Sequence, residues 1–162
     1  MNYREEVRDL FEVNSSLAAG EEPYCLAHCI SADFGMFGGV VVGFNERWDM
    51  KNKLVSKYTD LQEKFLLEGS QVIPIEVEDG AVNTTVYNLV TKQLVSHLPN
   101  YQSVVKALII MKAQMQSANQ SRLAIPKIGC GIDRLEWYVV SELIKAIFSD
   151  TDVDILVCCI GD

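Results

Sequence analysis

The sequence predicts an α/β fold of three layers, α/β/α, built around a mixed, mostly parallel sheet. Segments with the periodicity of strands alternate along the chain with segments of helical periodicity. The segments 24–30 and 153–160 are apolar on both faces, which is typical of parallel strands covered by helices on either side. The 162 residues can bury a core of their own, so we expect one domain over 1–162.

Turn residues place the remaining elements. Asp79-Gly80 predicts a hairpin that pairs 71–77 with 84–90 in antiparallel fashion, which makes the sheet mixed. Pro74 cannot donate to a strand ladder, so its strand is expected at an edge or a bulge. The other predicted elements are a short strand at 123–125 and helices at 40–48, 53–67, 102–116 and 135–148.

The helix at 53–67 has the clearer apolar stripe, and Gly69 is expected to end it. Its apolar side chains share one face: Leu54, Tyr58, Leu61 and Phe65. The first 13 residues are ambiguous, because their apolar side chains fit a helical stripe and also a strand.

Charge and cysteine content restrict the partners. The net charge of −8 argues against a broad basic face for nucleic acid, although backbone N–H groups can still bind a small anion. No secretory leader and no apolar run of membrane-span length is visible, and the five cysteines form no CxxC pair. We therefore expect a cytoplasmic protein with reduced thiols. A zinc site of Cys25, His28 and Cys29 is disfavoured, because on a strand His28 points away from both cysteines.

Two glycine-rich loops follow predicted strands. The first covers 31–39, and the second covers 127–134. Ligands of parallel sheets bind beyond the carboxyl ends of the strands, so both loops are expected on one ligand-binding rim. Gly129 and Gly131 permit positive φ and expose successive N–H groups, which suits a diphosphate. A plain strand-to-helix turn with Asp133 as the N-cap explains the same residues.

Three side chains are candidates for chemistry. Lys92 at a strand end is either a desolvated nucleophile or a solvated surface lysine. Asp133 is a candidate general acid and base. Cys130 is a candidate nucleophile with His28 as its base, although a small residue in a tight loop and a hydrogen-bonded core histidine are the favoured interpretations of the two.

Four sequence blocks occur in a specific order: Asp9-Leu10, LAHCIS at 26–31, LVTK at 89–92 and PKIGCGIDRLEW at 126–137. In these blocks the chain resembles the macro domain family, in its branch of terminal ADP-ribose protein glycohydrolases. The resemblance implies a macro-domain fold, with a strand at the N-terminus. It also implies ADP-ribose or an ADP-ribosylated protein as the partner, and neither a cofactor nor a metal.

The resemblance implies a role for each site residue. Lys92 would attack the anomeric carbon of the distal ribose, and Asp133 would assist departure of the acidic side chain and resolve the adduct. Asp9 would contact the adenine amino group, and Leu10 and Ile160 would border the adenine. The full set of implied ligand-binding residues is Asp9, Leu10, Ser31, Met36, Phe37, Gly38, Gly39, Lys127, Ile128, Gly129, Cys130, Gly131, Ile132 and Ile160.

The chain departs from the family at Phe37. The family has a Met-Gly-Ala-Gly pattern where this sequence has Met36-Phe-Gly-Gly39, so a phenyl ring stands where a glycine approaches the distal ribose. The ring would either narrow the pocket or swing outward and act as a lid. The stretch between Trp48 and Lys92 is also longer than the family leads us to expect.

Several functions fit these features besides hydrolysis of ADP-ribose from acidic side chains. The alternatives are a non-catalytic reader of ADP-ribose, a hydrolase of a free derivative (the 1''-phosphate, in Appr-1-p processing, or the O-acetyl ester), and removal of ADP-ribose from a nucleic-acid base. Because the net charge is −8, we expect nucleic acid to bind only where it carries ADP-ribose as a substrate. The expected oligomeric state is a monomer.

Overall fold

A six-stranded sheet forms the middle layer of the computed structural model, which describes residues 1–160. The last two residues of the expected domain, 161 and 162, lie outside the described part. The strands are β1 (Asn2–Val7), β2 (Cys25–Ser31), β3 (Gln71–Asp79), β4 (Val82–Lys92), β5 (Arg122–Ile125) and β6 (Asp154–Cys159). Their order across the sheet is β1-β6-β5-β2-β4-β3. Among residues 1–160, β3 and β4 are the one antiparallel pair, so the predicted mixed, mostly parallel sheet is confirmed.

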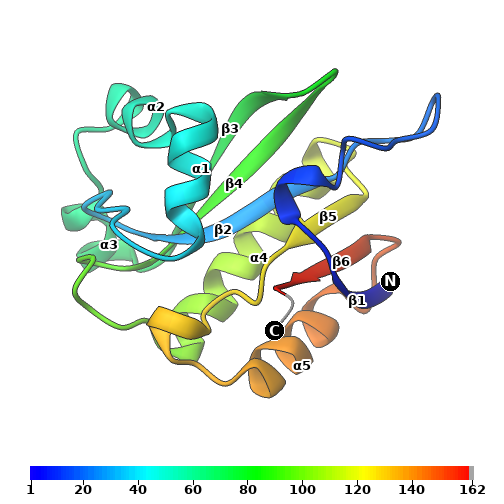
Figure 1. Cartoon of the computed structure of the whole chain (residues 1–162). Helices are drawn as coiled ribbons and strands as arrows, with labels where there is room; N and C mark the ends of the chain where they lie inside the picture. The colour runs from blue at the N-terminus through cyan, green and yellow to red at the C-terminus, as the bar shows by residue number, and fades with distance from the viewer. Residues whose placement is uncertain (161–162) are drawn as a thin grey trace.

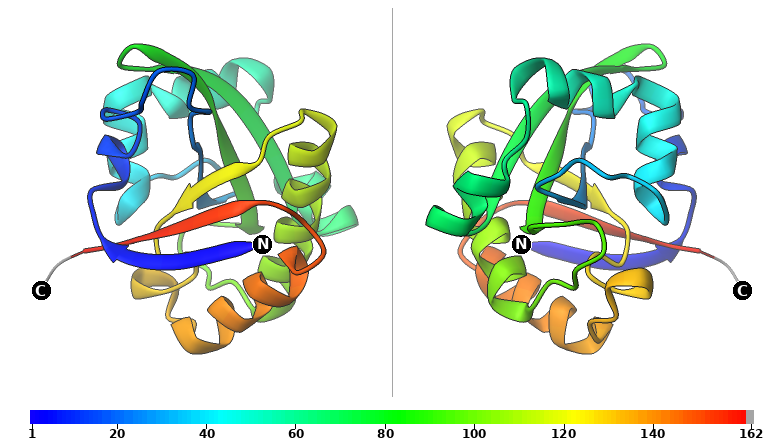
Figure 2. Two further views of the ribbon diagram at one scale, coloured as in Figure 1. Left: turned by 90° about the vertical axis from the view of Figure 1, so that its right-hand side faces the viewer. Right: turned by 90° about the vertical axis from the view of Figure 1, so that its left-hand side faces the viewer.

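Helices cover both faces of the sheet (Figures 1 and 2). They are α1 (Val40–Trp48), α2 (Met50–Lys57), α3 (Gln62–Glu68), α4 (Tyr101–Ser117) and α5 (Trp137–Phe148), with 3-10 turns η1 (Leu10–Glu12) and η2 (Gly131–Asp133). One core joins the sheet to α1–α3, and a second joins it to α4 and α5. Alternate side chains of β2 enter the two cores, which gives three layers. No helix among residues 1–160 has the length and apolarity to cross a bilayer.

The two edge strands of the sheet, β1 and β3, lie where the sequence and the family resemblance lead us to expect them. β1 pairs in parallel with β6, which confirms the strand that the family implies at the N-terminus. The turn η1 follows β1. Of the helix that was the alternative prediction for the first 13 residues, only this three-residue turn is helical. β3 forms the opposite edge of the sheet. Pro74 is exposed there, and an edge strand tolerates proline, which has no backbone N–H to donate to a neighbouring strand.

The predicted helix at 53–67 is wrong, because the structure has two short helices there. α2 ends at Lys57, and Tyr58 adopts an extended conformation with φ −139° and ψ 137°. The backbone N–H of Leu61 then donates to the carbonyl of Ala32 at 2.8 Å, and the Leu61 side chain is buried. This turn fastens the start of α3 to the first glycine loop, which a straight helix would not do.

Candidate functional site

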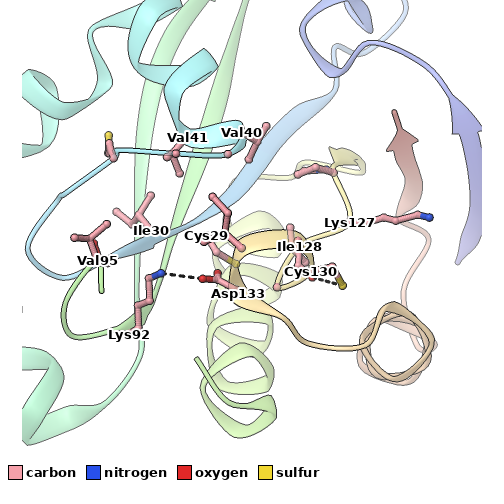
Figure 3. Close-up of a pocket in the computed structure, with 18 of the residues that line it drawn as sticks. Cys29, Ile30, Val40, Val41, Lys92, Val95, Lys127, Ile128, Cys130 and Asp133 are labelled. Atoms are coloured by element: carbon pink, nitrogen blue, oxygen red, sulfur yellow. Dashed lines mark hydrogen bonds and ion pairs between the residues drawn. The ribbon is translucent and has the colours of Figure 1, made fainter. Parts of the chain in front are cut away.

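A cavity of about 460 Å³ lies at the carboxyl ends of β2, β4, β5 and β6. These strands are parallel, so their ends meet at one edge of the sheet. The cavity is lined by Cys29, Ile30, Ser31, Met36, Phe37, Gly38, Gly39, Val40, Val41, Lys92, Val95, Pro126, Lys127, Ile128, Gly129, Cys130, Gly131, Ile132, Asp133, Cys158, Cys159 and Ile160. Both glycine loops therefore face one cavity, as predicted (Figure 3).

The first glycine loop is tied to the segment that follows β4. The Asp33 carboxylate accepts from the Ser31 hydroxyl at 2.5 Å and from the Gly35 N–H at 3.2 Å. Its other oxygen accepts from the Val95 N–H at 3.2 Å. A Cβ at Gly35 would lie 2.5 Å from Cβ of Val95, so only glycine allows this approach. The loop is thus held beside the strand end that carries Lys92.

The second glycine loop makes a single helical turn before α5. Gly129 and Gly131 have φ of +75° and +72°, and the Leu135 N–H closes the loop on the Gly129 carbonyl at 2.8 Å. The predicted start of a helix at residue 135 is two residues early, because α5 begins at Trp137 with Glu136 as its N-cap. Asp133 therefore does not cap this helix, and the simple-turn explanation of that residue is wrong.

The two loops touch across the mouth of the cavity. If Gly38 carried a side chain, its Cβ would lie only 3.0 Å from Cδ1 of Ile132. A Cβ at Gly39 would lie 3.4 Å from the same atom. The glycines thus leave room for the Ile132 side chain, which spans the gap between the loops.

Lys92 and Asp133 form an ion pair inside the cavity. Nζ of Lys92 donates to Oδ1 of Asp133 at 2.8 Å, and the two side chains point toward each other in Figure 3. Only 9% of the Lys92 side chain and 15% of the Asp133 side chain is exposed. Lys92 is therefore not the solvated surface lysine of the simpler alternative. One end of the cavity holds an amine and a carboxylate in direct contact.

Comparison with known proteins gives the same architecture. The macrodomain of Mycobacterium tuberculosis DarG superposes with a TM-score of 0.71 at 19% identity, covering 98% of this chain and 97% of that one. The macrodomain of Thermus aquaticus DarG gives 0.72 at 20% identity, with 96% of both chains covered. These likenesses establish the fold.

The sequence comparison decides the family. The chain is 34% identical over 145 residues to human ADP-ribose glycohydrolase OARD1, covering 90% of this chain and 88% of the relative. The Bos taurus protein of the same name is 33% identical over the same coverage. This chain belongs to the macro domain family. Within it, the chain lies in the glycohydrolase-like branch, and no protein-family model matches it.

Two residues implied for the adenine end do not line the cavity of this macro domain. Asp9 is exposed, and its carboxylate accepts from the Phe11 N–H at 2.9 Å as the cap of η1. Leu10 is buried in the core beside α1–α3. The other implied residues all line the cavity, although Lys127 extends away from the Lys92–Asp133 pair (Figure 3).

The structure adds cavity residues that the sequence analysis missed: Cys29, Ile30, Val40, Val41, Val95, Pro126, Cys158 and Cys159. Most of them adjoin a predicted residue, so proximity in sequence was a usable signal. Val95 lies in a segment without periodicity, and only its place three residues after Lys92 pointed to it.

Three of the cysteines that line the macro domain cavity, Cys29, Cys130 and Cys158, are not set up as nucleophiles. Burial raises the pKa of Cys29 to about 12 and that of Cys158 to about 11, and it raises the pKa of Cys130 as well. Cys130 donates to the Ile128 carbonyl at 3.6 Å. Thiols held in the neutral form attack poorly. These three cysteines therefore contribute apolar surface to the cavity wall.

His28 is a core residue rather than a base for Cys130. Its ring stacks on Phe44 at 3.9 Å, on the α1 side of the sheet, and Nε2 lies 2.6 Å from Oδ1 of Asn88. The Cys130–His28 pair is therefore wrong. Cys25 and Cys29 face the core on the other side of the sheet, and no group of three metal-ligating side chains occurs among residues 1–160.

Proposed function

We propose that this macro domain binds ADP-ribose in the cavity and hydrolyses the ester that joins it to an acidic side chain of a modified protein. The observation that carries the proposal is the Lys92–Asp133 ion pair between the two glycine loops. Diphosphate binding by backbone N–H groups requires neither residue, so a mere reader has no use for a desolvated amine next to a carboxylate. The 34% identity to an ADP-ribose glycohydrolase supports the same activity.

ADP-ribose would lie along the rim with its diphosphate between the glycine loops. A Cβ added at Gly131 would meet no atom within 4 Å, which leaves space for phosphate oxygens. The adenine would occupy the end lined by Cys158, Cys159 and Ile160. The distal ribose would then reach Lys92 and Asp133. In a related complex, Thermosipho africanus DarTG has been solved with ADP-ribose (TM-score 0.65, 17% identity).

The first chemical step forms a lysine adduct. Asp133 takes a proton from the Lys92 ammonium, and the free amine attacks the anomeric carbon of the distal ribose. A carbon–nitrogen bond forms as the bond from the anomeric carbon to the ester oxygen breaks. Asp133 returns its proton to the departing carboxylate, so the acidic side chain leaves as a carboxylic acid.

The second step restores the ion pair. Asp133, again a carboxylate, removes a proton from water that attacks the anomeric carbon, and the carbon–nitrogen bond breaks. The proton passes from Asp133 to the released amine of Lys92. The net reaction consumes one ester and one water and yields ADP-ribose and a free acidic side chain.

The deciding experiment is incubation with a protein that carries ADP-ribose on glutamate, and separately with ADP-ribosylated DNA. Release of ADP-ribose from the protein substrate is the expected result. Binding of ADP-ribose without release from either substrate would make the chain a reader. Release from DNA alone would overturn the choice of acceptor.

A further inference from the structure

Phe37 lines the cavity, yet its ring points to solvent. The residue is 77% exposed, so the ring that replaces a family glycine does not narrow the pocket. Its position is fixed by its neighbours, because Gly35 packs against Val95 and Gly38 packs against Ile132. Val95 follows Lys92 by three residues, and Ile132 precedes Asp133. Phe37 therefore belongs to a loop that contacts both segments that carry the ion pair.

Lys51 of α2 lies beside this ring. Its Nζ is 5.5 Å from the centroid of Phe37, which is cation–π distance. No carboxylate among residues 1–160 lies within ion-pair distance of this amine. The helix carries three lysines and no acidic residue, in a protein of net charge −8. An exposed ring that borders the cavity and a cation without an ion-pair partner among residues 1–160 thus lie side by side.

We propose that Phe37 and Lys51 form a docking platform for the acceptor, namely the acidic peptide segment around the modified side chain. The inference rests on the proposed function, because the acceptor is bonded to the carbon that Lys92 attacks. Phe37 borders the same cavity as Lys92 and Asp133, in a loop that contacts Val95 and Ile132, so an acceptor bonded to the reacting carbon emerges beside this loop. The ring offers planar apolar contact to the side-chain stem and backbone, and Lys51 offers charge complementarity to neighbouring carboxylates.

Charge favours a peptide over nucleic acid as the occupant. Sequence-tolerant binding of a single strand uses a basic groove along the backbone in addition to stacking on aromatic rings. The overall charge of −8 opposes a polyanion, and one lysine beside one ring matches a short acidic segment better.

The platform predicts an effect that depends on the size of the acceptor. A peptide carrying ADP-ribose on glutamate reaches the platform, whereas the acetyl group of O-acetyl-ADP-ribose is too small to do so. Lys51→Met should lower kcat/KM for the peptide about three- to tenfold, through KM, and leave the acetyl ester unchanged. Lys53→Met on the same helix is the matched control, because Lys53 borders a different surface beside Glu76 and Glu78.

A second variant tests the ring itself. Phe37→Leu keeps apolar bulk and removes the aromatic face, so the ratio of peptide to acetyl-ester turnover should fall as it does in Lys51→Met. The double variant should lose little more than either single variant, since both remove one platform. Equal losses on the two substrates, or no loss on the peptide, would overturn the proposal. A loss confined to an ADP-ribosylated oligonucleotide would overturn the choice of a peptide.

The same variants separate this proposal from the proposed function. If the wild-type protein releases nothing from any substrate, the hydrolase assignment fails. The platform is then tested by affinity, because Lys51→Met should still weaken binding of the modified peptide and spare free ADP-ribose. Unchanged affinity for the modified peptide would overturn the platform independently of catalysis.

Discussion

Nζ of Lys92 and Oδ1 of Asp133 are 2.8 Å apart, although the two residues are 41 positions apart in the chain. Lys92 ends β4, and Asp133 ends the 3-10 turn of the second glycine loop. Each charge is largely desolvated and is neutralised by the other. In the proposed reaction, substrate that enters between the two side chains replaces this contact, and the pair exchanges a proton at the reacting carbon.

Lys92→Ala should abolish turnover and change ADP-ribose affinity by no more than a few-fold. The residue is proposed to act only on the reaction path, so its loss lowers kcat rather than binding. Release of ADP-ribose from glutamate-modified protein measures the first effect, and calorimetry measures the second. Lys112→Ala is the control, since Lys112 pairs with Asp150 outside the cavity.

Asp133→Ala should also stop turnover, and it should accumulate the adduct if attack still occurs. Borohydride reduction followed by intact-mass measurement would detect ADP-ribose attached to the protein, and peptide mapping would place it on Lys92. Full activity of Lys92→Ala would contradict the covalent route and favour attack by water directed by Asp133 alone.

Gly131→Glu should eliminate ADP-ribose binding and leave the fold largely intact. The substitution puts a carboxylate at the proposed diphosphate position and strains a backbone with φ of +72°. Gly80→Glu provides a matched control, because Gly80 has φ of +63°, open space around it, and a place in the β3–β4 hairpin. Both variants should lower Tm, and only the first should lose affinity. Equal ADP-ribose affinity in the two variants would mean that the second glycine loop is a simple turn and does not bind the diphosphate.

ADP-ribose should raise the Tm of the wild-type protein in a concentration-dependent way. A ligand that binds only the folded state stabilises it by about 2.7 kcal/mol at one hundred times Kd. Thermal scans with ADP-ribose and with AMP, which lacks the distal ribose, would measure the shift. Absence of any shift at millimolar ADP-ribose would remove the cavity as its binding site.

The stability of the fold should decrease as the pH falls from about 6.5 to about 4. Burial lowers the pKa of His28 to about 4, so over this interval the unfolded chain binds a proton that the folded chain excludes. The free energy of unfolding should fall by about 1.4 kcal/mol per pH unit from this group. Above pH 6.5 its contribution is constant.

Urea unfolding at several pH values checks this slope. His28→Phe keeps a ring against Phe44 and removes the titrating group, so its slope should be shallower by one proton. His97→Gln, at an exposed position, serves as the control. An unchanged slope in His28→Phe would assign the acid sensitivity to the carboxylates instead.

Local sequence features predicted the sheet and the rim well. The apolar run of β2, the Asp79-Gly80 turn and the two glycine loops each depend on neighbouring residues, and each has the expected place. The helix at 53–67 failed because a hydrogen bond from Leu61 to Ala32 redirects the chain, and nothing local reports that bond.

The catalytic roles of individual residues were harder to predict from the sequence alone. Lys92 by itself fitted a solvated surface lysine better than a nucleophile, and only the family resemblance paired it with Asp133 before the structure brought the two together. The exposure of Phe37 and the packing of its loop against Val95 and Ile132 depend on segments far away in sequence. Such tertiary contacts leave no periodic pattern in the sequence, so they could not be predicted from it.

The walls of the cavity come from the ends of four strands, and this arrangement has a kinetic consequence. Residues of β2, β4 and β6, and the segment after β5, must all be in register before the cavity exists, and the register of β6 is completed by β1 from the opposite end of the sequence. Pairings of such sequence separation form late, because loop closure costs entropy before the contacts compensate for it. In stopped-flow refolding, fluorescence of a labelled ADP-ribose would therefore change only with the slowest phase, after helical circular dichroism has recovered.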